Sequence, residues 1–298
     1  MAARYLRFQL HGPEPRPAPL LERLLARADL LAPVQDWRAE AFDIIAPKTP
    51  MPAIAAAAHR AAGGPRREGC VFLATPVHYV AELSNVRFAE EGILRLDAAE
   101  AAALALDFNR VWSDAGVDLW AGSNRLFCGF DALLQASAQD PALARGRYIE
   151  SFLPVGPDAA RLRRLMSEME MWLFDHEVNR ARRGQAQLPI SGLWLWGGGA
   201  PLSSLPAVQG GAAGEDVLFD AFAPGSGRAA DVMVVDATPN SAAWADVEAQ
   251  WLVPALSDLS RGRVARLDLS AGERRFAVSA SWRRRFWRRA KPWWEYFE

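Results

Sequence analysis

The stretch "GLWLWGGGAP", residues 192–201, decides how the fold is interpreted. It places two tryptophans in an apolar run and ends that run on three glycines. Because Trp194 and Trp196 are two residues apart, they share one face of a strand. Glycines at the end of a strand bring backbone amides close to a ligand, since they lack a Cβ and tolerate positive φ. A core strand followed by a tight turn has the same pattern, and both interpretations remain open.

A long apolar stripe at helical spacing precedes this stretch and predicts a helix from Asp158 to about Arg183, with Gly184 as its stop. Its end, "FDHEVNRARR", contains Asp, His and Glu at consecutive positions. Two metal ligands on one helix face need i, i+4 spacing, so this triplet does not predict a metal site. His176 continues the apolar stripe, which favours a buried, hydrogen-bonded histidine. Asn179 follows at i+3 and is expected to face the same cleft.

A buried strand is predicted from residue 70, in "CVFLATPVHYV". Pro76 lacks a backbone donor, so we expect the strand to bend or end there and to leave His78 near a sheet edge. A histidine in that place serves as a general base, a phosphate contact or a structural residue. With four histidines in the chain and two cysteines outside any CxxC spacing, no metal site and no cofactor are expected.

The remaining patterns alternate between strands and helices. Asp97 and Glu100 form a capping-box pattern at the start of one predicted helix, and a hairpin is predicted around residues 122–124. Further helices are expected near residues 19–30, 36–46, 52–62 and 241–257, and strands at 4–10, 232–237, 264–269 and 274–280. This alternation predicts an α/β fold with a layered, mixed β-sheet flanked by helices. The predicted segments are an N-terminal subdomain (1–66), an α/β core (67–280) and a C-terminal tail (281–298).

Composition and charge narrow the class of protein. The chain has 298 residues, of which 51% are hydrophobic, and a formal net charge of −1. The tail, "SWRRRFWRRAKPWWEYFE", holds six basic and two acidic residues, whereas the rest holds 28 basic and 33 acidic. This balance gives no general case for nucleic-acid binding. No apolar run is long enough for a transmembrane helix and no signal-like segment opens the chain, so a cytoplasmic protein is expected.

The basic and aromatic tail leaves two interpretations open. Interleaved arginines and aromatic residues suit an anionic membrane surface, a nucleic acid or an acidic protein partner. The alternative is that the aromatic side chains dock onto the acidic remainder of the chain while the arginines stay solvated. Pro292 followed by two tryptophans favours this anchored terminus.

Several segments together resemble the bacterial RpfE-type regulatory protein family, which is often described as similar to cofactor-independent phosphoglycerate mutases. "TPVHYV" resembles its Asp-Pro-Val-His-Leu motif, and "LMSEMEMWLFDHEVNRARRGQ" resembles its long helix. "LPISGLWLWGGG" is similar to its Asn-Ser-Leu-Trp-Leu-Trp-Gly-Gly-Gly motif, and "RRRFWRR" to its terminus. The resemblance covers residues 70–290 and implies a reduced alkaline-phosphatase or phosphoglycerate-mutase-like core.

The sequence departs from those mutases where their chemistry resides. The family resemblance implies two metal ions held by Asp and His side chains and a serine nucleophile. Here the first strand is followed by "HGPEP" rather than an Asp-Gly turn, and the Asp-His pair lies on the long helix. Thr75 replaces the motif's Asp, and Ser191-Gly192 replaces Asn-Ser. If the core is shared, metal-dependent catalysis is not expected to be.

The sequence therefore predicts a regulatory or ligand-binding protein related to these mutases. A small anionic ligand would sit in one cleft formed by the following residues: His78, His176, Asn179, Trp194, Trp196, Gly197, Gly198 and Gly199. The alternatives are a phosphoglycerate mutase or phosphatase, and an interaction protein whose C-terminal tail binds a protein partner. No catalytic residue is assigned.

Overall fold

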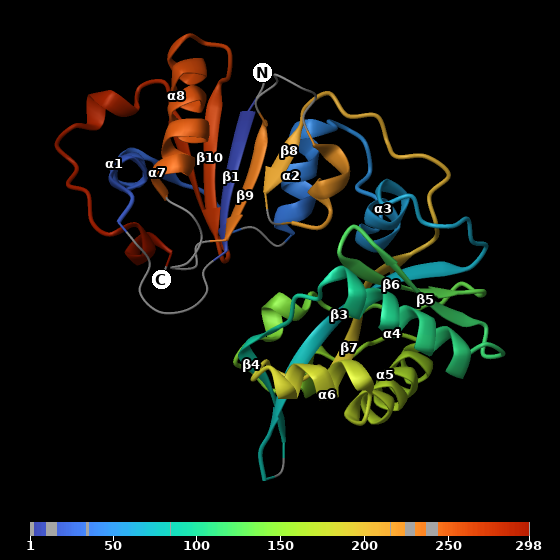
Figure 1. Cartoon of the computed structure of the whole chain (residues 1–298). Helices are drawn as coiled ribbons and strands as arrows, with labels where there is room; N and C mark the ends of the chain where they lie inside the picture. Colours follow the sequence, from blue (N-terminus) through green and yellow to red (C-terminus); the bar gives the residue numbers. More distant parts are fainter. Residues whose placement is uncertain are drawn as a thin grey trace. The chain divides into compact units, whose positions relative to one another are not determined.

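The chain forms two compact units in the computed structural model (Figure 1). The structure describes residues 3–9, 17–33, 36–83, 85–214, 216–223, 230–236 and 244–297. Unit 1 comprises Met1–Met51 and Pro206–Glu298, and unit 2 comprises Pro52–Leu205. Each unit contains a β-sheet flanked by helices, so the predicted mixed α/β fold is confirmed. The predicted segment boundaries at residues 66 and 280 do not coincide with this division, because distant parts of the sequence share one sheet.

The sheet of unit 1 has the order β2-β11-β10-β1-β9-β8. Its strands are β1 (Ala3–Gln9), β2 (Asp29–Leu30), β8 (Ala212–Gly214), β9 (Val232–Asp236), β10 (Arg266–Ala271) and β11 (Arg274–Ser279). Strand β1 is central and parallel to both β9 and β10, whereas β11 is antiparallel to β10 and β2. The N-terminal strand therefore joins strands that lie more than 200 residues later.

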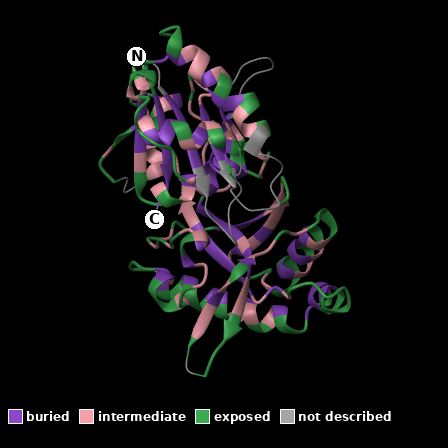
Figure 2. Ribbon diagram, turned by 90° about the vertical axis from the view of Figure 1, so that its left-hand side faces the viewer, coloured by how far each residue is buried: buried purple, intermediate pink, exposed green. Residues whose placement is uncertain are grey.

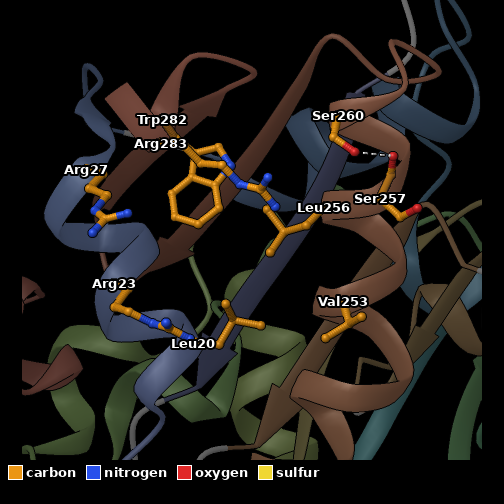
Figure 3. A pocket seen from close by; sticks show the side chains of 9 residues that line it. All are labelled: Leu20, Arg23, Arg27, Val253, Leu256, Ser257, Ser260, Trp282 and Arg283. Carbon is orange, nitrogen blue, oxygen red and sulfur yellow. Dashed lines mark hydrogen bonds between the residues drawn. The ribbon is translucent and has the colours of Figure 1, made fainter. Parts of the chain in front are cut away.

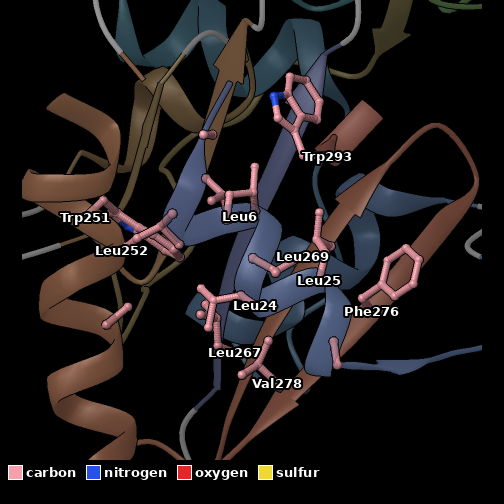
Figure 4. Packing of buried hydrophobic residues seen from close by; sticks show 14 of the residues in the cluster. Leu6, Leu24, Leu25, Trp251, Leu252, Leu267, Leu269, Phe276, Val278 and Trp293 are labelled. Carbon is pink, nitrogen blue, oxygen red and sulfur yellow. The ribbon is translucent and has the colours of Figure 1, made fainter. Parts of the chain in front are cut away.

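Helices cover both faces of this sheet. They are α1 (Pro19–Arg27), α2 (Trp37–Ile45), α7 (Trp244–Val247), a π-helical turn (Glu248–Leu252) and α8 (Val253–Ser260). Figure 4 shows apolar side chains of α1, the π-helical turn and the sheet meeting in one core around Leu6, Leu267 and Leu269. Trp293 from the C-terminal segment is fully buried in the same core. The anchored terminus predicted from residues 292–294 is therefore present.

Unit 2 is built on the long central strand β3 (Cys70–Ala81). The other strands are β4 (Val86–Ile93), β5 (Val117–Gly122), β6 (Arg125–Phe130) and β7 (Gly192–Gly199). Strand β3 pairs with β7 along one edge, and with β6 and then β4 along the other, all antiparallel. Strands β6 and β7 and residues 70–77 of β3 are largely buried, whereas β4 and β5 are mostly half-buried or exposed (Figure 2).

The predicted break at Pro76 is wrong, because β3 continues through it. The carbonyl of Pro76 accepts a hydrogen bond from Leu94, so the nitrogen of Pro76 faces the same edge. On that edge the pairing with β6 ends at Leu73 and the pairing with β4 begins at Val77. The proline thus occupies a position where the ladder needs no donor.

The helices of unit 2 are α3 (Ile54–Ala61), α4 (Ala98–Val111), α5 (Ala159–Phe174) and α6 (Glu177–Gly184). The predicted capping box is confirmed at α4, where Asp97 and Glu100 bond to each other's backbone N–H. The predicted hairpin is formed by β5 and β6, and Ser123 and Asn124 adopt the positive φ of a tight turn. The single helix predicted over residues 158–183 is wrong, because it is broken at His176.

Among the described residues, none of the helices combines the length and apolar character that crossing a bilayer requires.

Candidate functional site

The two tryptophans of β7 are core residues with satisfied indole donors. Trp194 is fully buried, and its Nε1 donates to the carbonyl of Gln139 at 2.9 Å. Trp196 donates from Nε1 to Oγ1 of Thr75 at 2.8 Å. Thr75, which stands where the Asp-Pro-Val-His-Leu motif has Asp, therefore acts as a hydrogen-bond acceptor. Because residues 192–196 of β7 are all buried, the two tryptophans are packed within the core.

The three glycines lie within β7 and allow other groups to approach the strand closely. Gly197 has φ +65° at an irregularity in the pairing with β3, which is typical of a β-bulge. A Cβ on Gly198 would lie 2.2 Å from the ring of Phe72, and a Cβ on Gly199 would lie 2.3 Å from the Cβ of Ala53. These contacts support the interpretation of a core strand over that of a ligand loop.

His78 links β3 to the segment that leads into β7. Its Nδ1 lies 2.9 Å from the carbonyl oxygen of Pro189 and 3.2 Å from Oγ of Ser191. Since a carbonyl can only accept, Nδ1 carries the proton. The Ser191 hydroxyl also accepts from the backbone N–H of Tyr79 at 3.0 Å. A structural role accounts for these contacts, and a ligand role for the half-buried His78 stays a prediction.

His176 ends one helix and caps the next. Its Nδ1 accepts from the backbone N–H of Val178 at 3.2 Å, so this nitrogen is unprotonated. Its Nε2 points toward Oδ2 of Asp107 at 3.4 Å, and its ring packs edge-on against Trp172. Burial lowers the pKa of His176, and Asp107 opposes that shift. The neutral imidazole is therefore the form that the fold selects.

The buried side chain of Asn179 connects the end of α5 to the segment that precedes β7. Its amide nitrogen donates to the carbonyls of Leu173 and Ile190, both at 2.8 Å. Its amide oxygen accepts from the N–H of Ile190 at 2.7 Å. The polar atoms of the Asn179 side chain thus all bond to backbone groups of the fold. These contacts do not place the side chain in a cleft shared with His176.

A shallow hollow of about 350 Å³ lies beside His176. Its lining mixes both charges and comes from α4, α5 and α6: Asp107, Arg110, Val111, Trp172, Asp175, His176, Glu177 and Arg180. Several of these charges pair with neighbours on their own helices, as Arg110 does with Asp107 at 3.0 Å. With three acidic and two basic side chains in its lining, the hollow does not favour an anionic ligand.

The predicted residues do not form one cleft. Val77 pairs with Gly192 at one end of β7, and Val71 pairs with Gly199 at the other. Strand geometry therefore separates His78 from the glycines by roughly 20 Å. His78 and Asn179 both contact residues 189–190, so the structure brings those two side chains to the same end of β7.

The larger hollow lies in unit 1, in a groove of about 680 Å³ between α1 and α8 (Figure 3). Its lining consists of Leu20, Arg23, Arg27, Val253, Leu256, Ser257, Ser260, Trp282 and Arg283. Residues 20, 23 and 27 recur at helical spacing on α1, and residues 253, 256, 257 and 260 do so on α8. Trp282 closes one end of the groove in Figure 3.

Glu248, in the π-helical turn that precedes α8, connects α1 to that turn. Oε1 of Glu248 accepts the backbone N–H groups of Leu20 and Leu21 at 2.8 and 3.0 Å. These are orphan donors of the first turn of α1, which has no capping side chain of its own. This contact fixes the start of α1 beside the π-helical turn that leads into α8.

The groove is electropositive over an apolar floor. Its three cationic side chains are Arg23, Arg27 and Arg283, and none of the described residues lining it is acidic. The guanidinium carbons of Arg27 and Arg283 lie 5.3 and 5.6 Å from the ring centroid of Trp282. Nε of Arg27 is buried without a hydrogen-bond partner among the described residues. Nε of Arg23 donates to the carbonyl of Pro19 at 3.3 Å, so an anion in the groove would accept from the outer N–H groups of these arginines.

Sequence reasoning missed this groove because its residues come from three separate segments. Arg23 and Arg27 are an ordinary i, i+4 pair on an amphipathic helix, and Leu256 and Ser257 are unremarkable on another. Only the placement of α1 and α8 on the same face of the sheet brings them together. The arginine-rich tail was recognised as a candidate element, but its contribution of Trp282 and Arg283 to a groove was not.

In the parts of the chain that the structure describes, no group of three or more His, Cys, Asp or Glu side chains is arranged to hold a metal ion. Cys70 and Cys128 are both free and buried, as their apolar surroundings in the sequence predict.

Comparison with known proteins finds distant structural similarity. No family model matches the chain, and no curated protein matches it. A cofactor-independent phosphoglycerate mutase from Thermoplasma acidophilum DSM 1728 is similar in structure, with 17% identity, 92% of this chain and 89% of that chain covered, and a TM-score of 0.39. The PH0037 protein from Pyrococcus horikoshii has 11% identity, coverages of 93% and 87%, and a TM-score of 0.39. Membership of the RpfE-type family stays a prediction.

Proposed function

We propose that this chain is a ligand-binding protein and that its ligand is an amphipathic anion held in the groove between α1 and α8. The observation that supports this most is the gathering of Arg23, Arg27 and Arg283 around one open groove. Their guanidinium groups lie within 4.0 Å of no carboxylate among the described residues. Like charges that share a concave surface repel one another, and an anion removes that cost while accepting charge-assisted hydrogen bonds.

The apolar part of the ligand is inferred from the floor of the groove. Leu20, Leu256 and Trp282 are partly buried against the core of unit 1, and each leaves some apolar surface toward the groove. Val253, which also lines the groove, is 53% exposed. The volume of about 680 Å³ falls within the usual range for small-molecule sites. A phosphate or carboxylate carrying an alkyl or aromatic group fits this combination of charge and apolar surface.

This proposal keeps the ligand-binding function that the sequence predicts and moves the site from unit 2 to unit 1. A regulatory role would follow if the bound anion changed what the chain contacts. The alternative function, a phosphoglycerate mutase or phosphatase, is separated by a coupled activity assay together with metal analysis of the purified protein. Turnover of phosphoglycerate with a bound metal would contradict a purely binding role.

The direct test is calorimetric titration of the full chain with octyl phosphate. We expect octyl phosphate to bind at least about tenfold more tightly than inorganic phosphate or the neutral octyl glucoside, because only octyl phosphate supplies both the charge and the chain. Equal binding of octyl phosphate and octyl glucoside would contradict the role of the arginines.

The matched variant is the double substitution Arg23→Gln with Arg27→Gln. It should weaken octyl phosphate binding by about tenfold or more, since each lost charge-assisted hydrogen bond is worth about 1.5 kcal/mol. The control is Arg163→Gln on α5, an exposed arginine of unit 2. If the control weakens binding as much as the double variant, binding is nonspecific and the groove is not the site.

A further inference from the structure

The segment from Trp282 to Lys291 presents Phe286 and Trp287 to solvent and docks through Arg285 and Arg288. Phe286 and Trp287 are 74% and 66% exposed and pack edge to face at 5.7 Å. Arg285 instead forms a two-point ion pair with Asp29, at 2.6 and 2.9 Å. The expectation that these aromatic side chains dock while the arginines stay solvated is therefore wrong at these positions.

The local helix type explains this reversal. Residues Trp282–Arg285 form the 3-10 helix η5, and the bond from the N–H of Arg288 to the carbonyl of Arg285 continues the same i, i+3 spacing. With three residues per turn, Trp282, Arg285 and Arg288 share one face. That face lies against the end of α1, where Arg285 and Arg288 also donate to the carbonyls of Arg27 and Ala28.

The other arginines and aromatic residues of this segment lie off that face, and Arg283 among them also lines the groove. They are Arg283, Arg284, Phe286, Trp287 and Arg289, and all five are exposed. Residues 282–291 contain six basic side chains and no acidic one. The resulting surface, called the tip here, pairs two large apolar side chains with three cations that meet no carboxylate among the described residues. The segment is held at both ends, because Trp293 follows it into the core.

The chemistry of the tip matches a lipid surface better than the other anionic partners. Leu30, 64% exposed, adjoins the Asp29 that anchors Arg285, and so adds apolar surface near the tip. A nucleic acid offers phosphates but no apolar layer in which such side chains are buried. An anionic bilayer offers phosphates at the depth that arginine reaches and an acyl boundary at the depth that Trp and Phe prefer.

We propose that the tip docks this chain onto an anionic lipid surface. Phe286 and Trp287 enter the boundary between headgroups and acyl chains, while Arg283, Arg284 and Arg289 contact lipid phosphates. This proposal goes beyond ligand binding in the groove and stands without it, although Arg283 belongs to both surfaces.

The test is co-sedimentation of the full chain with two kinds of vesicle, phosphatidylcholine alone and phosphatidylcholine mixed with phosphatidylglycerol. We expect binding to the mixed vesicles to be at least about tenfold stronger and to weaken as salt is raised. Equal binding to both vesicles would overturn the proposal. So would binding to polyglutamate or to single-stranded DNA without binding to vesicles, since it would assign the tip to a protein or a nucleic acid.

The deciding variant is Phe286→Ser with Trp287→Ser, and its control is Phe174→Ser in unit 2. Phe174 is 73% exposed, so it matches the tip residues in exposure. The double variant should lose most vesicle binding, whereas the control should retain it; equal behaviour of the two overturns the proposal. Both variants should keep the melting temperature and the octyl phosphate affinity of the natural chain. Loss of vesicle binding with retained octyl phosphate binding thus separates this proposal from the proposed function.

Discussion

Two regions of this molecule contrast in how their polar groups are used. Around β7 in unit 2, the indoles of Trp194 and Trp196 and the amide of Asn179 all have partners within the fold. In the groove of unit 1, Arg23, the half-buried Arg27 and Arg283 have no carboxylate partner among the described residues. The Trp- and Gly-rich motif of β7 therefore serves packing. The positively charged groove is formed by residues of two ordinary amphipathic helices and the C-terminal segment. A candidate site is therefore better judged by unsatisfied groups than by unusual composition.

The largest expected effect tests the packing role of the glycines. Gly198→Val should destabilise the protein by about 4 kcal/mol, because the added atoms would overlap the buried ring of Phe72. Urea unfolding followed by tryptophan fluorescence measures the loss.

Gly184→Ala is the matched control for this substitution. Gly184 is the last residue of α6, and a Cβ there meets nothing within 4 Å. Its alanine variant should be neutral or slightly stabilising. A Gly198→Val protein of natural stability would instead favour a loop that is free to bind a ligand.

The second test removes the hydrogen bonds of the Asn179 side chain, which connect α5 to the segment before β7. Asn179→Ala removes three hydrogen bonds and leaves the buried N–H of Ile190 without its partner. A loss of about 3 kcal/mol in unfolding free energy is expected. The exposed Asn85→Ala serves as the control and should change stability little. If the Asn179 variant is as stable as the control, the residue is free for a role other than packing.

The third test uses pH. His59 is buried between Trp120 and Phe127, and burial together with Arg67 lowers its pKa to about 4. Because the unfolded chain takes up the proton first as pH falls, stability is complete above about pH 6.5 and decreases down to about pH 4. The loss attributable to His59 is on the order of 2 kcal/mol at pH 4.

His59→Leu should flatten this dependence, as followed by urea unfolding at a series of pH values. The lowered pKa of His176 acts in the same direction and leaves some slope in that variant. An unchanged slope in His59→Leu would show that other groups control the acid response.

The smallest expected effect on stability belongs to the groove. Arg23→Gln with Arg27→Gln should change the unfolding free energy by no more than about 1 kcal/mol, mainly through the lost contact of Arg27 with Trp282, while weakening octyl phosphate binding. Differential scanning calorimetry checks the first part. If the double variant is strongly destabilised and its octyl phosphate affinity is unchanged, the groove arginines serve packing rather than binding.

Local signals in the sequence were sufficient for many individual elements. The capping box of Asp97 and Glu100, and the turn at Ser123-Asn124, depend on residues within a few positions of one another. The mixed α/β class follows from the alternation of such elements. The break at His176 was missed because the apolar stripe continues through it, although a histidine side chain is able to cap the next helix.

The candidate site depended on contacts that no local pattern contains. Whether Pro76 interrupts β3 is decided by where two other strands end. Whether the glycines of β7 are exposed is decided by Phe72 and by the start of α3. The tail was recognised as basic and aromatic, but the face that docks depends on three residues per turn instead of the usual 3.6.

The position of β1 between β9 and β10 has a consequence for how the chain folds during synthesis. Unit 2 is one continuous stretch, and every strand of its sheet is present once residue 199 has been made. Strand β1 precedes that stretch in the chain, whereas both of its partners emerge from the ribosome only after the stretch is complete. The nascent chain must therefore keep this strand, with Tyr5 and Leu6 that are later fully buried, unpaired throughout the synthesis of unit 2. Pairing across such a sequence separation is slow and leaves the strand exposed in the meantime.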